Sequence, residues 1–274
     1  MGIVLVTAVF AVILAMSLGV ALGFFREFFK VEKDPMIGKV RAILPGANCG
    51  ACSYPGCDSY AEAVASRACE VTRCSVGGKA VADSLAALLG VNASAEDIVA
   101  VLACQGSKEH APVKGDYVGV KTCRAAKLST GGTKLCAWGC LGFGDCTLVC
   151  KFDALHMGED GLPHVDYAKC TGCGMCIAEC PQVILKRVPK DTKGSMVICS
   201  NRNTVKAMVM KTCKVGCIKC EICVKNCPEN CITMVNGIPV TDYEKCTSCG
   251  VCVQKCPTKV YKLLQTDIGI AVEV

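Results

Sequence analysis

Cysteine is the residue that most limits what this chain can fold into, because 26 of its 274 residues are Cys. That density is typical either of disulfide-stapled secreted domains or of proteins that wrap metal clusters in thiolates. Secreted disulfide frameworks are usually shorter than about 100 residues, and this chain shows no cleavable export signal. Aromatic residues make up only 5% of the sequence, which is thin for large conventional cores. We therefore expect metal–thiolate bonds to organise much of the fold.

The N-terminal segment predicts a membrane anchor. Residues 2–25 contain no charged side chain, and a helix of that length spans a hydrocarbon core of roughly 30 Å. The apolar run is too long for a signal peptide and has no basic residue before it. Arg26, Lys30 and Lys33 follow, so the positive-inside rule predicts a single pass of the cytoplasmic membrane with the rest of the chain in the cytoplasm. Thiols stay reduced there, so the cysteines are expected to bind metal.

A small iron–sulfur lobe is predicted just beyond the anchor. Four cysteines with the spacing C-x2-C-x4-C-x16-C form it, namely Cys49, Cys52, Cys57 and Cys74. Four thiolates from a short loop can hold either zinc or a [4Fe-4S] cluster. Zinc fingers usually pair two C-x2-C motifs, so the uneven spacing here favours the cluster.

The second half of the chain contains an internal repeat of the bacterial two-cluster ferredoxin pattern. Within residues 213–257, C-x2-C-x2-C-x3-C-P occurs twice. In this pattern three closely spaced cysteines ligate one cluster and the fourth reaches across to the other. The predicted ligand sets are Cys217, Cys220, Cys223 and Cys256 for one cluster, and Cys227, Cys246, Cys249 and Cys252 for its neighbour.

Residues 136–181 repeat this plan with one ligand missing. Phe143 stands where the aligned repeat has Cys220. Cys136 lies four residues before the first cysteine of its run, as Cys213 does in the other repeat, so we expect Cys136 to supply the missing thiolate. The predicted ligand sets are Cys136, Cys140, Cys146 and Cys180, and then Cys150, Cys170, Cys173 and Cys176.

Five predicted [4Fe-4S] clusters leave six cysteines without a role, namely Cys69, Cys104, Cys123, Cys199, Cys213 and Cys231. Four of them flank the ferredoxin repeats and could converge on a sixth metal site, namely Cys104, Cys123, Cys199 and Cys213. The alternative is that they are free buried thiols, which is the usual state of an unligated cysteine.

Charge and motifs exclude several other functions. An oxidised cluster with four thiolates carries a charge of about −2, so five clusters would turn the formal +6 of the chain into about −4. The basic composition is therefore no argument for nucleic-acid binding. The sequence has no G-x-G-x-x-G, P-loop or G-x-S-x-G motif, and its three His residues are scattered. We expect no catalytic residue of its own and no bond chemistry.

The predicted fold class is α+β, with a transmembrane helix, a four-Cys lobe and two tandem bacterial-type ferredoxin domains of βαββαβ order. Residues 81–91 and 94–103 predict two short helices, and residues 117–120 predict a short strand. The predicted domains are the anchor 1–26, the lobe with its helical segment 27–110, a linker 111–133, a first ferredoxin-like domain 134–190, a connecting segment 191–212, a second ferredoxin-like domain 213–262 and a tail 263–274.

The order of these parts resembles the B subunit of the Rnf complex. The resemblance covers essentially the whole chain and is carried by the uncharged helix, the segment KDPMIGKVRAILPGANCGACSYPGC and the ferredoxin repeats. The longer form with CRAAKLSTGGTKLCAWGCLGFGDC is similar to versions from anaerobes.

The resemblance implies an ion-translocating ferredoxin:NAD oxidoreductase. In that family this subunit takes electrons from soluble reduced ferredoxin and passes them to flavin-bearing membrane subunits and finally to an NAD-binding subunit, while other subunits move the sodium ion or proton. Two alternatives remain open, a membrane-tethered polyferredoxin that serves a different reductase or hydrogenase, and a zinc scaffold.

Overall fold

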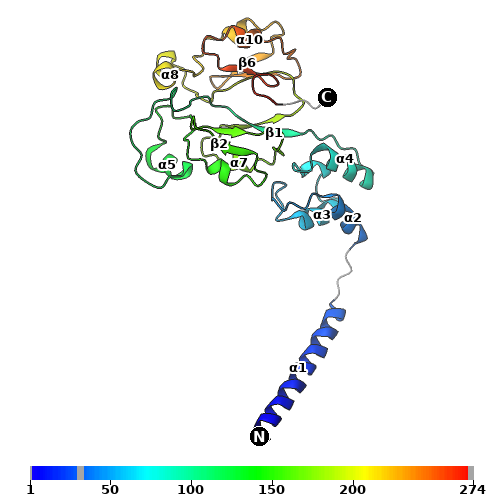
Figure 1. Cartoon of the computed structure of the whole chain (residues 1–274). Coiled ribbons are helices and arrows are strands. Elements are labelled where there is room, and N and C mark those ends of the chain that lie inside the picture. The colour runs from blue at the N-terminus through cyan, green and yellow to red at the C-terminus, as the bar shows by residue number, and fades with distance from the viewer. Residues whose placement is uncertain (1, 30–33, 271–274) are drawn as a thin grey trace. The chain divides into compact units, whose positions relative to one another are not determined.

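A computed structural model describes residues 2–29 and 34–270 and divides the chain into two units, Met1–Lys39 and Val40–Val274. The first unit contains helix α1 (Gly2–Phe28) and the start of α2 (Pro35–Ile43) (Figure 1). Among the described residues α1 is the one helix that is long and apolar enough to cross a membrane, over Leu5–Phe25. It matches the predicted anchor, whereas Lys30 and Lys33 of the basic flank lie outside the described residues.

The second unit begins with a small helical lobe. Its elements are α3 (Cys57–Ala65), the 3-10 turn η1 (Val71–Arg73) and α4 (Gly78–Leu89). Arg41 Nε donates to Asp58 Oδ1 at 2.7 Å and so ties α2 to the start of α3. The lobe is largely helical, because its segments are rich in Ala and hold no long run of β-branched residues.

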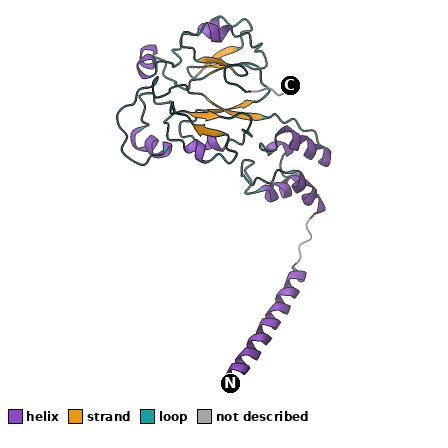
Figure 2. Ribbon diagram, in the orientation of Figure 1, coloured by secondary structure: helices purple, strands orange, loops and turns teal. Residues whose placement is uncertain are grey.

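Two segments of the second unit have the same order of elements. The first repeat unit contains β1 (Ile98–Leu102), α6 (Asp145–Leu148), β2 (Leu155–Met157), β3 (Pro163–Val165), α7 (Met175–Glu179) and β4 (Leu185–Pro189). The second repeat unit contains β5 (Ser195–Val197), α9 (Ile222–Lys225), β6 (Ile232–Val235), β7 (Ile238–Thr241), α10 (Val251–Gln254) and β8 (Tyr261–Leu263). In each unit the middle strands form a hairpin and the first strand pairs antiparallel with the last (Figure 2).

The structure corrects two of the predicted elements. Residues 98–102 form strand β1 and not a helix, because the β-branched run IVAVL is buried over three successive positions and pairs along its whole length with β4. No strand is present over residues 117–120, and helix α5 (Cys123–Thr130) occupies part of the predicted linker. A further helix, α8 (Lys206–Thr212), precedes the second run of cysteines. Strand pairing thus brings β1 and β5, which precede the predicted boundaries at residues 134 and 213, into the repeat units.

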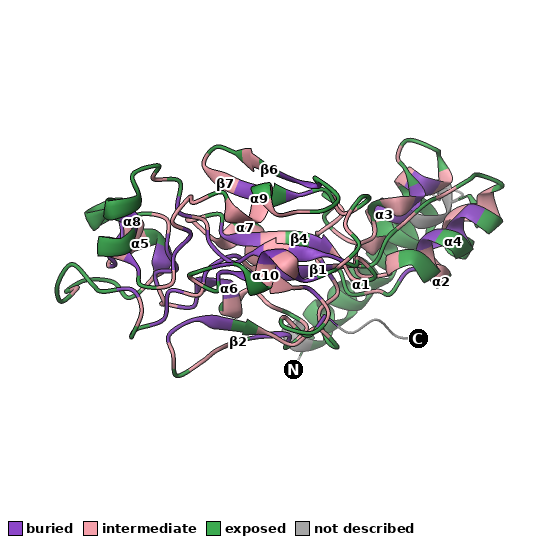
Figure 3. Ribbon diagram, turned by 90° about the horizontal axis from the view of Figure 1, so that it is seen from above, coloured by how far each residue is buried: buried purple, intermediate pink, exposed green. Residues whose placement is uncertain are grey.

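The buried residues form several small clusters instead of one large core (Figure 3). Tyr261 and Val260 pack in one cluster with buried cysteines of the second repeat unit, among them Cys217, Cys252 and Cys256. Leu162 and Ile184 pack in another with Cys104 and Cys140. Cysteine side chains therefore occupy positions that large apolar residues fill in most proteins of this size.

Candidate iron–sulfur sites

The second repeat unit gathers its cysteines into two groups of four. Site D comprises Cys217, Cys220, Cys223 and Cys256, and site E comprises Cys227, Cys246, Cys249 and Cys252. In site D, burial and then the sulfurs of the other three cysteines raise the pKa of Cys223 to about 12. The cysteines of site E line one enclosed cavity. In each group one cysteine comes from the opposite half of the repeat, as the sequence pattern predicts.

A fifth cysteine, Cys231, also lines the cavity of site E, with its sulfur 3.3 Å from that of Cys227. The corresponding position in the first repeat unit is Ala154, whose backbone N–H donates to the Cys150 sulfur at 3.4 Å. Because the first repeat unit gathers four cysteines without one at this position, Cys231 is not needed as a ligand.

The loops that carry the cysteines share one backbone conformation. In each run the second and fourth residues after the first cysteine have a positive φ; the pairs are Gly142 and Gly144, Gly172 and Gly174, Lys219 and Glu221, and Ser248 and Gly250. Two left-handed residues turn the chain twice, so that successive Cys side chains point to the same side. The run with Phe143 keeps this conformation although its middle cysteine is missing.

Site B, in the first repeat unit, comprises Cys150, Cys170, Cys173 and Cys176. Burial and then the sulfurs of Cys170, Cys173 and Cys150 raise the pKa of Cys176 to about 12. Strand β1 supports this site directly, because the Ala100 N–H donates to the Cys170 sulfur at 3.5 Å.

We expect the Gly172→Ala variant to lose the cluster at site B. A Cβ at this position would overlap the backbone carbonyl of Ile98 in β1, and backbone cannot yield as a side-chain end can. The matched control is Gly250→Ala in site E, where φ is also positive but the added Cβ would meet only the Leu263 side chain at 3.8 Å. The control should cost about 1–2 kcal/mol of backbone strain and keep its iron. Iron analysis of the two full-length variants distinguishes them, and equal iron contents would contradict the role of the β1 contact.

Site C is completed by a cysteine that the sequence analysis did not place there. One enclosed cavity is lined by Cys123, Cys140, Cys146 and Cys180, which define this site. Burial and then the sulfurs of Cys140, Cys123 and Cys180 raise the pKa of Cys146 to about 12. Cys136 does not line this cavity, so the predicted replacement of the missing ligand by Cys136 does not fit the geometry.

Two departures from the repeat bring Cys123 to site C. Phe143, which replaces the middle cysteine, packs against Tyr117 with ring centroids 5.5 Å apart. Asp145 stands where the second repeat unit has Ile222, and its buried carboxylate accepts hydrogen bonds from the backbone N–H groups of Cys123 at 2.9 Å and Arg124 at 3.1 Å. These are the first amides of α5, which have no partner within the helix. In the sequence, the signal that could have indicated Cys123 is an acidic residue, Asp145, in a cysteine loop that lacks its middle cysteine.

Site A, in the helical lobe, comprises the four predicted residues Cys49, Cys52, Cys57 and Cys74. Burial raises the pKa of Cys74, and the sulfurs of Cys52, Cys57 and Cys49 add to this effect. Asn48 Oδ1 accepts a hydrogen bond from the Cys57 N–H at 2.8 Å and so closes the loop at the start of α3.

Sites A, B and C follow one another in space. Burial and then the Cys49 sulfur of site A raise the pKa of Cys173 in site B. The Cys176 sulfur of site B is among the charges that raise the pKa of Cys146 in site C. The three groups are therefore close enough for their charges to interact.

One buried side chain, that of Tyr261, lies close to both site D and site E. Tyr261 is 1% exposed, and burial together with the sulfurs of Cys223 in site D and Cys252 in site E raises its pKa. Its hydroxyl lies 3.0 Å from Thr241 Oγ1. Site C and site D are each connected to another set of cysteines, which includes Cys104 and Cys199.

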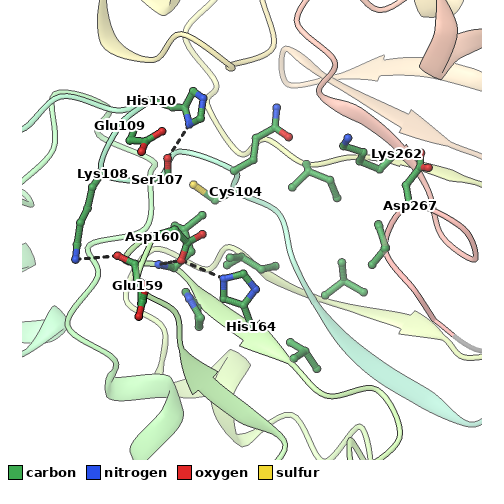
Figure 4. Close-up of a pocket in the computed structure, with 18 of the residues that line it drawn as sticks. Cys104, Ser107, Lys108, Glu109, His110, Glu159, Asp160, His164, Lys262 and Asp267 are labelled. Atoms are coloured by element: carbon green, nitrogen blue, oxygen red, sulfur yellow. Dashed lines mark hydrogen bonds and ion pairs between the residues drawn. The ribbon is translucent and has the colours of Figure 1, made fainter.

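A wider pocket of about 800 Å³ lies beside Cys104 (Figure 4). Its charged groups are largely paired with each other or with backbone. Lys108 Nζ donates to the Glu159 carbonyl at 3.0 Å, and His164 Nε2 lies 3.0 Å from Asp160 Oδ1. The pocket holds one cysteine and no set of four among its lining residues, so it is distinct in kind from the sites above.

Comparison with known proteins agrees with these groups. Residues 44–76 match FeS, an Fe-S cluster family, residues 162–185 match a 4Fe-4S binding domain and residues 216–260 match a 4Fe-4S dicluster domain. The B subunit of the Na(+)-translocating ferredoxin:NAD(+) oxidoreductase complex of Acetobacterium woodii is 41% identical over 83% of this chain and 68% of its own length. The chain belongs to the family of Rnf B subunits.

Other family members match over a similar span. The B subunit of the ion-translocating oxidoreductase complex of Methanosarcina acetivorans is 40% identical over 85% of this chain and 88% of its own length. The B subunit of the proton-translocating ferredoxin:NAD(+) oxidoreductase complex of Clostridium ljungdahlii is 39% identical over 88% of this chain and 85% of its own length. The resemblance seen in the sequence is thereby confirmed.

Proposed function

We propose that this member of the Rnf family is the membrane-anchored electron-transfer subunit of an ion-translocating ferredoxin:NAD oxidoreductase, with [4Fe-4S] clusters at sites A to E. The observation that carries the proposal is the gathering of cysteines into consecutive groups of four within one compact unit. A bound [4Fe-4S] cluster supplies a carrier that takes up and releases one electron without bond making at the protein. The chain itself binds, spaces and shields these carriers and performs no independent bond chemistry.

The donor sets fit such clusters better than single metal ions. At sites C and E the sulfurs surround a cavity, and among residues 2–29 and 34–270 no three His, Cys, Asp or Glu side chains converge on a position for one ion. Thiolate donors spaced around a cavity suit a cubane of several atoms, whereas zinc draws its ligand atoms to about 2.3 Å from one point. The spacing therefore argues against the zinc scaffold.

The repeat units correspond, in this proposal, to two tandem ferredoxin domains. Each has βαββαβ order with paired outer strands and exchanges its fourth cysteine between the two halves, which is how bacterial two-cluster ferredoxins bind their clusters. The extra helices α5 and α8 are insertions into this plan.

Electrons are proposed to enter at site E and leave at site A. Cys249 of site E is exposed, whereas the other cysteines are buried or half-buried, so an incoming redox protein can approach this site most closely. Site A lies at the opposite end of the series and follows the anchor in the sequence. The names of two relatives contain ferredoxin:NAD(+) oxidoreductase, which supports ferredoxin as the donor and NAD as the final acceptor. The single apolar span found among the described residues contains no charged side chain, so the ion path is assigned to other subunits.

The test is reduction of the full-length chain, purified without oxygen in detergent, by reduced ferredoxin. The visible absorption of the clusters should bleach in proportion to the ferredoxin added. A colourless protein, or one that reduced ferredoxin leaves unchanged, would contradict the proposal. The alternative role, in which a tethered polyferredoxin serves a different reductase, predicts purification from the membrane without flavin-bearing subunits.

The anchor gives a separate prediction. Expressed without the other subunits of the complex, a variant that lacks residues 2–29 should move from the membrane fraction to the soluble fraction, because it loses all 21 residues of the apolar span. Its iron per chain should be unchanged, since none of the cysteines lies in this segment. A tag at the C-terminus of the full-length chain, probed with protease in inside-out vesicles and in whole cells, reports whether the clusters face the cytoplasm. Retention of the truncated chain in the membrane would refute the single-anchor proposal.

A further inference from the structure

We propose that a sixth [4Fe-4S] cluster is bound between the two repeat units by Cys104, Cys136, Cys199 and Cys213. We name this set the junction site. The inference rests on the proposed function, since it treats the cysteine groups as cluster sites. It differs from the sequence expectation in one ligand, because Cys136 takes the place of Cys123.

The four side chains share one enclosed cavity and are each 9% exposed or less. A Cβ added to Gly106 would lie 3.6 Å from the Cys104 sulfur and 3.7 Å from the Cys213 sulfur, so these two thiols face the same space. Cys136 and Cys199 line the same cavity, so all four thiols border one space.

The space between the sulfurs has the size that recurs at the other sites. The cavity of the junction site measures about 20 Å³, against about 10 Å³ at site E and about 20 Å³ at site C. Three cavities of similar size, each lined by at least four cysteines, point to the same kind of occupant.

The two repeat units contribute equivalent ligands. Each provides a cysteine two residues after its first strand, Cys104 after β1 and Cys199 after β5. Each also provides the first cysteine of a C-x2-G-C motif, Cys136 or Cys213. The equivalence extends to the support of the sulfurs. The backbone N–H of Cys140 donates to the Cys104 sulfur at 3.4 Å. The backbone N–H of the equivalent residue, Cys217, donates to the Cys199 sulfur at 3.4 Å.

The surroundings favour an anionic occupant. Lys134 is buried, 5% exposed, and its Nζ donates to the Gly106 carbonyl beside the cavity. Asn201 Nδ2 lies 3.6 Å from the Cys136 sulfur. A basic side chain thus lies beside the cavity, where it complements the net negative charge that an iron–sulfur cluster with four thiolates would carry.

The junction site also joins two series that are otherwise separate. The hydrogen bonds to the Cys104 and Cys199 sulfurs come from ligand residues of site C and site D, respectively. With the junction site the order becomes A, B, C, junction, D, E without a break. Without it, electrons from site D would have to cross the boundary between the repeat units in one longer step to reach site C.

The experiment measures iron and sulfide per chain in the full-length protein, purified without oxygen in detergent, for wild type and four variants. Wild type should contain about 24 irons, and Cys136→Ser and Cys213→Ser should each contain about 20. The double variant should also contain about 20, because both residues ligate one cluster. If they served two different clusters, the double variant would fall to about 16. The control variant is Cys69→Ser, a half-buried cysteine outside the six sets, which should keep about 24.

Each outcome decides the matter. Wild type with about 20 irons that is still reduced by ferredoxin would overturn the junction site and leave the proposed function standing. Wild type without iron would overturn both. If the single variants lost nearly all iron, misfolding would be the cause, and the spin count of fully reduced wild type, expected at about six clusters per chain, would then decide; about five would refute the site.

Discussion

Replacing Cys123 by Ser is expected to remove about four irons from the purified chain and to leave the other sites filled. Cys123 is the fourth thiol of the site C cavity, and the local run of cysteines has Phe143 where its repeat has a ligand. A serine hydroxyl at this buried position is a poor replacement for a thiolate. The loss should be visible as reduced iron content and as a lower yield of electrons accepted from reduced ferredoxin.

A second substitution turns this loss into a sharper test. In the Cys123→Ser background, Phe143→Cys places a thiol at the middle position of a loop whose backbone already matches that of its repeat, with φ of 81° at Gly142 and 83° at Gly144. The added cysteine should restore about four irons. Phe143→Ala in the same background is the control for lost packing against Tyr117 and should restore none. If Cys123→Ser kept its full iron content while Cys136→Ser lost iron from site C, the original sequence prediction would be right after all.

Replacing Asp145 by Ala should empty the same site without touching a ligand. The Asp145 carboxylate, 8% exposed, holds the first two amides of α5 and so fixes Cys123 against site C. Loss of a capping carboxylate costs about 1–2 kcal/mol, and here the two freed amides would also be left buried or half-buried. We expect the iron content to fall by about four and the start of α5 to become more open to amide hydrogen exchange.

The variant Asp145→Asn tests whether the hydrogen bonds of Asp145 or its negative charge hold Cys123 at site C. Asp145→Asn keeps one acceptor oxygen, so it should retain more of the site C iron than Asp145→Ala. Thr122→Ala removes the other cap of α5, whose Oγ1 accepts from Ala125 N–H at 3.2 Å, but leaves the Cys123 amide bond intact. It should destabilise the helix by about 1 kcal/mol and keep the iron. Equal iron in all three variants would show that Asp145 does not position Cys123.

Sequence reasoning reached the cysteine groups that are local in the chain. Sites A, B, D and E follow from spacing alone, because a loop of ten or so residues can gather its own thiols and only the exchanged cysteine comes from afar. At site C the structure groups Cys123, and not Cys136, with the other three thiols. Spacing could not show this, because Cys123 comes from a helix outside the repeat and is held by Asp145. The spacing of the cysteines does not show such a tertiary contact. The sequence does show a difference at this position, since the first repeat has Asp145 where the second has Ile222.

The conformation of strand β1 also could not be predicted from local sequence alone. Its alanine and valine content allowed either a helix or a strand, and its partner β4 lies more than eighty residues later in the chain. Pairing at that distance decides the conformation and also extends the repeat unit toward the N-terminus. Once β1 is assigned, Cys104 and Cys199 become equivalent residues, which the unaligned sequence did not reveal.

The order of the ligands along the chain has a consequence for biogenesis. All four cysteines of site A precede the ligands of the other sites in the chain, so that lobe leaves the ribosome first and can be loaded early in synthesis. Site C must wait for Cys180, and a site that needs both Cys104 and Cys213 must wait until the second repeat unit has begun. Iron delivery to this protein is therefore expected to begin at the membrane end, and a chain that stops before residue 213 would hold all the ligands of sites A, B and C but could not complete the junction site, site D or site E.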